Sequence, residues 1–184
     1  MGRCVWTATC VLALGLSAIA AQGQEQMPMG GTGSEPMSNV TAQVAPPAGP
    51  LKITFGDKST EWTPATLAPL PHTTITVYNE HIKANQTYSG VPLASLLTSL
   101  GVPAKPHGKD FKIYLVAEGS DGYEVVYSIG EVSPDVHDGT VLVADAVDGK
   151  PLGNTGPVQL VATGEKRPAR WVRNLVAIRV LTAE

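Results

Sequence analysis

Cysteine is scarce in this chain of 184 residues, which contains only Cys4 and Cys10. Both lie within the first ten residues, so the rest of the sequence has no thiol of its own. Without a thiol, that part can form no disulfide, offers no thiolate to a metal ion and has no cysteine nucleophile. A domain built from it must be held together by its hydrophobic core.

Charged and aromatic side chains are also few. Charged residues make up 16% of the chain, aromatic residues make up 5%, and the formal net charge is −3. Domains that bind nucleic acid usually have a strongly basic balance, so no nucleic-acid partner is expected. Hydrophobic residues make up 43%, which is too many for a disordered chain. The composition predicts one globular domain with many turns, because it contains 19 glycines and 15 prolines.

Residues 1–21 have the pattern of a secretory signal peptide. Arg3 supplies a positive charge, Val5–Leu16 is mostly apolar, and Ala18-Ile19-Ala20 has the small residues that signal peptidase requires. The apolar run is shorter than a membrane-spanning helix needs. We therefore expect a periplasmic or secreted protein, with no stable membrane insertion once this leader is cleaved. An uncleaved N-terminal anchor is the alternative.

Residues 22–50 contain few large aliphatic side chains and many Gly, Pro, Ser and Gln residues. This composition is typical of a flexible linker. From Leu51 onward, periodic apolar patterns replace it. The sequence therefore predicts a linker over 22–50 and a globular domain over 51–184.

The first part of this domain has patterns of both strands and helices. Leu51–Phe55 alternates with period two, and Thr74–Tyr78 is β-branched and aromatic, so both are expected to be strands. Thr63 resembles an N-cap and Pro64 suits the first helical position, which predicts a short helix over 64–69.

A second helix is expected from Leu93 onward. Its leucines follow the spacing i, i+3, i+4 and i+7, which places them on one face: Leu93, Leu96, Leu97 and Leu100. Gly101 follows as a C-terminal cap. This stripe of leucines is expected to belong to the core.

The second part of the domain is expected to be mostly β-strand, with a helical turn over 129–132. The expected strands are 112–117, 123–127, 141–147, 158–162 and 171–181. Turns over 118–122 and at Asp148-Gly149 have the composition of hairpin connections. In the last strand, one face is expected to hold Val172, Val176, Ile178 and Val180, and the other Arg173 and Arg179. Together these elements predict an α+β fold with a mixed β-sheet and short helices.

The sequence offers no clear catalytic or metal-binding motif. The histidines His72, His81, His107 and His137 are not spaced as metal ligands, so no metal site is predicted. Motifs of serine hydrolases and glycine-rich phosphate loops are absent from the sequence.

The most suggestive feature is a basic run near the C-terminus. It contains Lys166, Arg167, Arg170, Arg173 and Arg179, and no acidic residue lies between Glu165 and Glu184. Arginine binds carboxylate or phosphate through two parallel hydrogen bonds, which makes Arg170 and Arg173 candidates for an anion clamp. Trp171 between them is a candidate stacking surface. The alternative is a solvated sheet face that acidic loops balance.

Several segments in order resemble the molybdopterin-binding domain of the sulfite oxidase family. They are Tyr88-Ser89-Gly90-Val91-Pro92-Leu93-Ala94-Ser95-Leu96-Leu97, Ser120-Asp121-Gly122-Tyr123, Val141-Leu142-Val143-Ala144, Asp148-Gly149-Lys150-Pro151-Leu152, Gly156-Pro157-Val158-Gln159-Leu160-Val161 and Arg170-Trp171-Val172. The resemblance covers about residues 51–181. It implies an α+β fold with a mixed sheet, in which loops hold a pyranopterin and its phosphate, and it implies an oxidoreductase as the parent activity.

The chain departs from this family at several residues. Family enzymes hold molybdenum through a cysteine thiolate, and residues 51–184 contain none. Gln159 stands where the family usually has an arginine, and Thr155 stands where it has a histidine, whereas Arg170 keeps the basic residue before the tryptophan. Sulfite oxidation by the usual mechanism is therefore not expected.

Three functional hypotheses follow. The first is a non-catalytic binding module for an anionic small molecule, such as a pterin phosphate. The second is a molybdopterin-dependent oxidoreductase component that acts with an envelope redox partner. The third is a cofactor-free domain that interacts with another envelope protein.

The candidate ligand-binding residues combine the basic run with a turn. They are Arg170, Trp171, Arg173, Asp121 and Tyr123, and His81 in the polar loop expected between Tyr78 and Tyr88 is a further candidate. Asp121 also suits turn geometry, and Tyr123 also suits a half-buried strand position.

Overall fold

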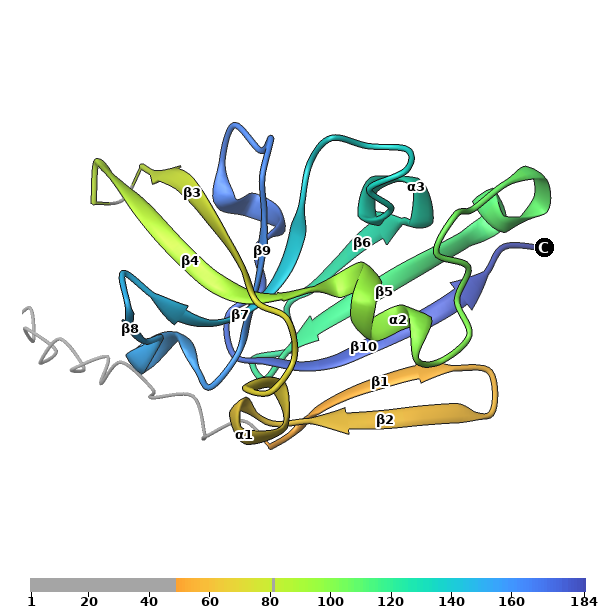
Figure 1. Cartoon of the computed structure of the whole chain (residues 1–184), viewed down its shortest axis with the longest axis horizontal. Coiled ribbons are helices and arrows are strands. Elements are labelled where there is room, and N and C mark those ends of the chain that lie inside the picture. The colour runs from red at the N-terminus through yellow and green to blue at the C-terminus, as the bar shows by residue number, and fades with distance from the viewer. Residues whose placement is uncertain (1–48, 81) are drawn as a thin grey trace, which may run out of the picture. The chain divides into compact units, whose positions relative to one another are not determined.

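The computed structural model describes residues 49–80 and 82–184, which form an α+β unit with two β-sheets and a few short helices (Figure 1). The expected leader and nearly all of the expected linker lie outside these residues. No helix in the described part of the chain has the length and hydropathy needed to cross a membrane.

The first sheet is mixed and has the strand order β2-β1-β10-β5-β6. Its strands are β1 (Leu51–Phe55), β2 (Lys58–Trp62), β5 (Ile113–Gly119), β6 (Glu124–Ser128) and β10 (Leu175–Thr182). Strands β1 and β10 pair in parallel, and the other pairs in this sheet are antiparallel. Strand β10 therefore lies between the hairpin β1–β2 and the hairpin β5–β6 (Figure 1).

The second sheet is antiparallel and has the order β3-β4-β7-β8, with β9 also paired to β7. Its strands are β3 (Thr73–Asn79), β4 (Ala84–Pro92), β7 (Val141–Val147), β8 (Lys150–Pro151) and β9 (Gln159–Ala162). A single bridge between Leu160 and Val172 joins β9 to the segment that leads into β10.

Short helices connect these strands. They are α1 (Pro64–Leu67), α2 (Leu93–Thr98), α3 (Ile129–Val132) and the 3₁₀ turns η1 (Gly108–Lys112), η2 (Gly153–Thr155) and η3 (Pro168–Arg170). The side chain of Thr63 accepts a hydrogen bond from the Thr66 N–H (3.3 Å), which confirms the expected N-cap of α1. Gly101 has φ +88°, as its expected role after α2 requires.

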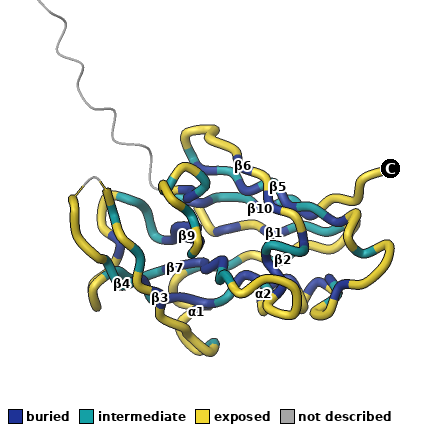
Figure 2. Tube along the Cα trace, turned by 90° about the horizontal axis from the view of Figure 1, so that it is seen from above, coloured by how far each residue is buried: buried dark blue, intermediate teal, exposed yellow. Residues whose placement is uncertain are grey.

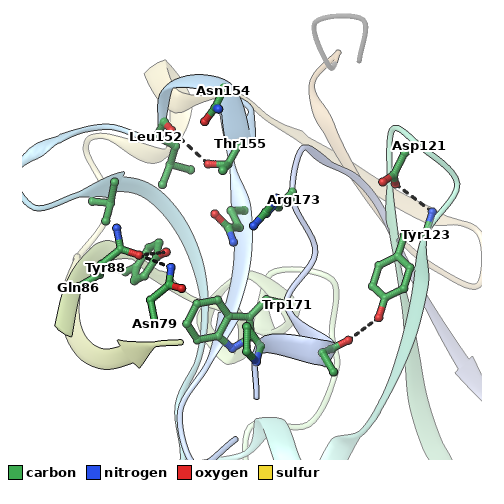
Figure 3. Close-up of a pocket in the computed structure, with 14 residues that line it drawn as sticks. Asn79, Gln86, Tyr88, Asp121, Tyr123, Leu152, Asn154, Thr155, Trp171 and Arg173 are labelled. Atoms are coloured by element: carbon green, nitrogen blue, oxygen red, sulfur yellow. Dashed lines mark hydrogen bonds between the residues drawn. The ribbon is translucent and has the colours of Figure 1, made fainter. Parts of the chain in front are cut away.

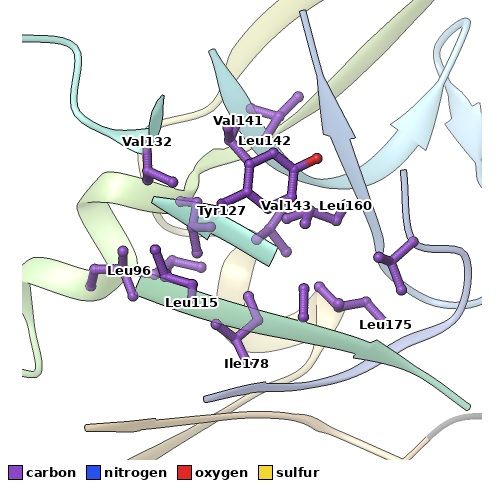
Figure 4. Close-up of a cluster of buried hydrophobic side chains, with 14 of the residues drawn as sticks. Leu96, Leu115, Tyr127, Val132, Val141, Leu142, Val143, Leu160, Leu175 and Ile178 are labelled. Atoms are coloured by element: carbon purple, nitrogen blue, oxygen red, sulfur yellow. The ribbon is translucent and has the colours of Figure 1, made fainter. Parts of the chain in front are cut away.

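One hydrophobic core draws on both sheets and on α2. The leucine stripe is buried as expected, with Leu93, Leu96, Leu97 and Leu100 all at most 2% exposed. Burial alternates along β5, which follows the period of two of a half-buried strand. Residues of both sheets meet in this core (Figure 4), and the buried stretches of β7 and β9 belong to it (Figure 2).

The structure corrects the expected sheet and strands in several places. The mixed sheet is accompanied by a second sheet, so the domain has two sheets and not one. Strand β2 was not expected, because its sequence KSTEW is mostly polar. In the structure it lies at the edge of the sheet, and most of its residues are exposed. The polar stretch between Tyr78 and Tyr88 was expected to be a loop, but most of it forms the hairpin of β3 and β4.

The last strand begins at Leu175 and not at Trp171. Asn174 has φ +49°, which breaks the extended backbone before the strand. A register shift between Leu175 and Ala177 then changes the alternation of faces, so Leu175 and Ile178 are both fully buried. The expected single valine face from Val172 onward is therefore wrong.

Candidate functional site

A pocket of about 440 Å³ opens where loops of both sheets meet (Figure 3). We call it the Arg173 pocket. It is lined by Asn79, Gln86, Tyr88, Asp121, Tyr123, Val147, Leu152, Asn154, Thr155, Gln159, Pro168, Ala169, Trp171 and Arg173. Four of the five residues expected to bind a ligand therefore line one pocket, and Arg170 does not.

Arg173 lies in the short segment between η3 and β10, and hydrogen bonds fix this segment on both sides. The N–H of Asn174 donates to the carbonyl of Thr155 (2.6 Å), and the N–H of Ser120 donates to the carbonyl of Asn174 (3.0 Å). The side chain of Arg173 is exposed toward the pocket. It forms no ion pair or hydrogen bond with any residue that the structure describes.

Two aromatic side chains form an inner wall of the Arg173 pocket. Tyr88 of β4 and Trp171 pack edge to face, with ring centroids 5.5 Å apart. The Trp171 Nε1–H donates to the carbonyl of Ala162 (3.0 Å), and the Tyr88 hydroxyl donates to Gln86 Oε1 (3.1 Å). Burial raises the pKa of Tyr88, and the positive charge of Arg173 opposes that shift. The opposing effect indicates that the charge of Arg173 acts on this wall.

Amide side chains supply most of the polar groups of the pocket. Asn79 Nδ2 donates to Gln86 Oε1 (2.6 Å), which already accepts from Tyr88. Asn154 also lines the pocket, and it is exposed. Gln159, the first residue of β9, is only 3% exposed, and its Oε1 has no hydrogen-bond partner within the described chain. Sequence analysis had singled out Gln159 only as a departure from the family and had not predicted the other three.

Asp121 and Tyr123 lie on the opposite side of the pocket from Tyr88 (Figure 3). Asp121 Oδ1 accepts a hydrogen bond from the Tyr123 N–H (3.0 Å), which confirms that Asp121 shapes the turn. The Tyr123 hydroxyl donates to the carbonyl of Ala169. Tyr123 is 46% exposed and precedes β6, so the interpretation as a half-buried strand residue is wrong.

Arg170 faces a different group of residues, which we call the Arg170 cluster: Arg170, Glu131, Glu165 and Tyr127. Its guanidinium donates to Glu131 Oε1 (2.7 Å) and, through Nε (2.9 Å) and Nη2, to Glu165 Oε1. It also lies 4.7 Å from the centre of the Tyr127 ring, in a cation–π contact. The hydrogen bonds to both carboxylates raise the pKa of Arg170. The expected pairing of Arg170 with Arg173 in one anion clamp is therefore not found in this conformation.

The histidines do not form a metal site in the described part of the chain. No group of three His, Cys, Asp or Glu residues comes close enough to hold a metal ion there. His72 pairs with Asp145 (3.0 Å), and this hydrogen bond, together with one to the carbonyl of Leu70, raises its pKa. His81 lies outside the described residues.

Comparison with known proteins adds no identification. No protein-family model matches the chain, and no curated protein matches its sequence. The geometry and chemistry of the Arg173 pocket are therefore the main evidence for function.

Proposed function

We propose that this chain is a non-catalytic binding module for an anionic small molecule, which it binds through Arg173. The volume of about 440 Å³ lies in the range of small-molecule sites. Arginine beside such a space suits a carboxylate or a phosphate, because its planar fork can donate two parallel hydrogen bonds.

The observation that carries this proposal is the contrast among three arginines. Arg170 and Arg179 each bind two carboxylates: Arg170 binds Glu131 and Glu165, and Arg179 binds Glu118 and Glu124 (both 2.6 Å). Arg173 has no such partner among the described residues, although it lines a pocket. An arginine that is positioned by its backbone and lacks a protein anion is well suited to bind an anion from solution.

The proton-bearing groups of the pocket support binding more than catalysis. The Tyr88 hydroxyl donates to Gln86, and the Tyr123 hydroxyl donates to a backbone carbonyl. One oxygen of Asp121 is engaged by the turn. A general base needs a free group within reach of the substrate proton, and these groups are largely committed to the protein itself.

The resemblance to molybdopterin-binding domains can be tested against this set of residues. Side-chain amides such as Gln159 and Asn154 can pair with the polar edge of a pterin, and Arg173 can pair with its phosphate. No thiolate is available from residues 49–184, and the described residues form no cluster of metal ligands. The pocket thus suits the organic part of that cofactor and lacks a protein ligand for molybdenum, so we derive no redox step.

Binding of simple anions tests the proposal. The full chain is titrated with inorganic phosphate, pterin-6-carboxylate and 3-phenylpropanoate by isothermal calorimetry. At least one of these is expected to bind saturably. Arg173→Gln should weaken that binding by about 10-fold or more, since a charge-assisted hydrogen bond contributes roughly 1.5–3 kcal/mol.

Arg167→Gln is the matched control, because Arg167 is exposed and does not line the pocket. It should change affinity by less than about 2-fold, which corresponds to roughly 0.4 kcal/mol. Equal effects of the two variants would contradict the proposal, as would the absence of saturable binding by all three anions. That second result would favour a cofactor-free interaction domain.

Metal analysis of natively purified protein separates the remaining alternative. A molybdopterin-dependent redox component should carry molybdenum and phosphorus in a fixed ratio to protein. A binding module for other anions should carry no stoichiometric molybdenum. The same preparation tests export, because an intact mass that lacks residues 1–21 is expected for a cleaved leader.

A further inference from the structure

The pocket has a second unusual feature, the buried amide of Gln159. Gln159 begins β9, where it pairs with Ala144 of β7, and it is one of only two polar residues counted as buried in the described chain. Its Oε1 is shielded from solvent and accepts no hydrogen bond from a described group. An unsatisfied buried carbonyl costs roughly 1–3 kcal/mol, so natural structures retain few of them.

Several donors around the pocket are engaged elsewhere, and the guanidinium of Arg173, which is not, is assigned to the anionic end of the ligand. Trp171 Nε1 donates to the carbonyl of Ala162, and the backbone N–H of Val172 donates to the carbonyl of Leu160 (3.1 Å). Across the pocket, Asn79 Nδ2 donates to Gln86. The terminal amide torsion of glutamine is broad, so a rotation can turn Oε1 toward a molecule in the pocket. A ligand that carries a hydrogen-bond donor would then satisfy it.

The charges around the pocket point to the same kind of ligand. Arg173 and Asp121 both line it, one positive and one negative. Asp148 is close enough to act on Tyr88, where its negative charge raises the pKa against the effect of Arg173. Carboxylates therefore at least balance the single cation. A molecule with one negative and one positive group would complement both signs, which a simple anion would not.

We infer that the ligand of the Arg173 pocket is a small zwitterion, an α-amino acid, whose carboxylate binds Arg173 and whose ammonium group donates to Gln159 Oε1. This inference rests on the proposed function, because it assigns the anionic end of the ligand to Arg173. It makes Gln159 a specificity-determining residue for the ammonium group. Side chains of the amino acid would extend toward the aromatic wall of Tyr88 and Trp171.

Two ligand pairs that differ only in the α-amino group test this inference. They are L-phenylalanine with 3-phenylpropanoate and L-glutamine with glutaramate, each titrated against the full chain. In at least one pair, the amino acid should bind about 10-fold or more tightly than its deaminated partner, because a hydrogen bond from a charged donor contributes roughly 1.5–3 kcal/mol.

Variants of Gln159 locate the effect. Gln159→Leu has a side chain without an acceptor, and it should reduce the preference for the amino acid over its deaminated partner to less than about 2-fold. Gln159→Glu should increase the preference, since a carboxylate attracts the ammonium group more strongly. Circular dichroism establishes that each variant is folded.

The outcomes separate this inference from the proposed function. If 3-phenylpropanoate binds through Arg173 as tightly as L-phenylalanine, and glutaramate as tightly as L-glutamine, the inference is wrong and the proposed function stands. A preference for the amino acids that persists in Gln159→Leu likewise contradicts the role of Gln159. If neither the amino acids nor their deaminated partners bind in an Arg173-dependent way, the inference is wrong, and the proposed function is also wrong when phosphate and pterin-6-carboxylate fail to bind.

Discussion

Arg170 and Arg173 are three residues apart, on either side of Trp171, yet the structure gives them opposite surroundings. Arg170 binds two carboxylates and lies over the Tyr127 ring, beside a small pocket of about 130 Å³. Arg173 has no protein anion among the described residues and lines a pocket of about 440 Å³. The difference shows that the arginines of one basic run need not form one site, because carboxylates from other segments neutralise some of them and not others.

Glu131, one of the two carboxylate partners of Arg170, is also held by hydrogen bonds from Ser128. Ser128 caps α3, and its N–H (2.8 Å) and hydroxyl (3.0 Å) both donate to Glu131 Oε2. The other oxygen of Glu131 then accepts from Arg170. The Tyr127 hydroxyl donates to the backbone carbonyl of Arg170 (2.7 Å). Arg170 thus ties α3 and β6 to the segment that follows β9, which is a structural role.

The largest expected effect comes from a glycine beside each arginine. Gly156, near the Arg173 pocket, has φ +100° and ψ 175°, and an added Cβ would lie 2.6 Å from Asn174 Cα and closer still to Asn174 Oδ1. Gly164, which lines the Arg170 side, has φ +77° with open space around it. Gly156→Ala should lower the free energy of unfolding by about 3 kcal/mol or more, because it combines backbone strain with a clash. Gly164→Ala should cost only about 1–2 kcal/mol.

Urea denaturation of the two variants measures this difference. If Gly164→Ala proves as destabilising as Gly156→Ala, the close packing between Gly156 and Asn174 is not what fixes the Arg173 segment. The two regions would then not differ in how tightly their backbones are packed.

Replacing each arginine by methionine should separate stability from binding. Arg170→Met leaves two carboxylates without their cation, and it should lower the free energy of unfolding by about 1–2 kcal/mol; its partial exposure to solvent limits the effect. Arg173→Met removes no hydrogen bond or ion pair to a described residue and should change that free energy by less than about 0.5 kcal/mol.

The expected order for ligand affinity is the reverse. Calorimetry with 3-phenylpropanoate should show a loss for Arg173→Met and no loss for Arg170→Met at a temperature where both are folded. Weaker binding in Arg170→Met alone would place the anion site in the Arg170 cluster and would contradict the assignment of ligand binding to Arg173.

The smallest effect concerns acid. Burial alone would raise the pKa of Glu131, but hydrogen bonds from Ser128 and Arg170 outweigh burial and hold that pKa below its ordinary value of 4.5. A carboxylate whose pKa is lower in the folded state stabilises the fold above the ordinary pKa, and this contribution is lost as the pH falls through the lowered value. The free energy of unfolding should therefore decline below about pH 4.5, and Glu131→Gln should reduce this decline.

Melting temperatures recorded between neutral and acidic pH give the measurement. Arg173→Met serves as the control, since Arg173 has no partner carboxylate among the residues that the structure describes, and its acid profile should follow that of the unchanged chain. An acid profile of Glu131→Gln identical to that of the unchanged chain would show that the Ser128–Glu131–Arg170 contacts do not carry the effect.

Local patterns in the sequence predicted most of the elements. The leucine spacing from Leu93 placed α2 and its buried face, Thr63-Pro64 placed α1, and the predicted helical turn over 129–132 coincides with α3. These features depend on neighbours within a few residues, so they can be recognised without the fold. The α+β class was confirmed for the same reason, whereas the finer resemblance to molybdopterin-binding domains stays a prediction.

The remaining features depend on contacts between distant residues. Strand β2 has a polar sequence and is a strand only because β1 pairs with it. The start of β10 depends on Asn174, whose backbone carbonyl accepts from Ser120. The residues Asn79, Gln86 and Asn154 come from three separate elements, and nothing in their local sequence marks them as neighbours. The unsatisfied oxygen of Gln159 likewise cannot be recognised from the sequence, because its burial and its lack of a donor depend on the fold.

The position of β10 in the first sheet has a consequence for the order of assembly. Because β10 lies between β1 and β5, the two flanking hairpins share no edge until residues 175–182 have been synthesised. Pairing of β1 with β10 closes a loop of more than a hundred residues, and contacts at such sequence separation form slowly. The nascent chain therefore leaves the ribosome with its first sheet still in two pieces.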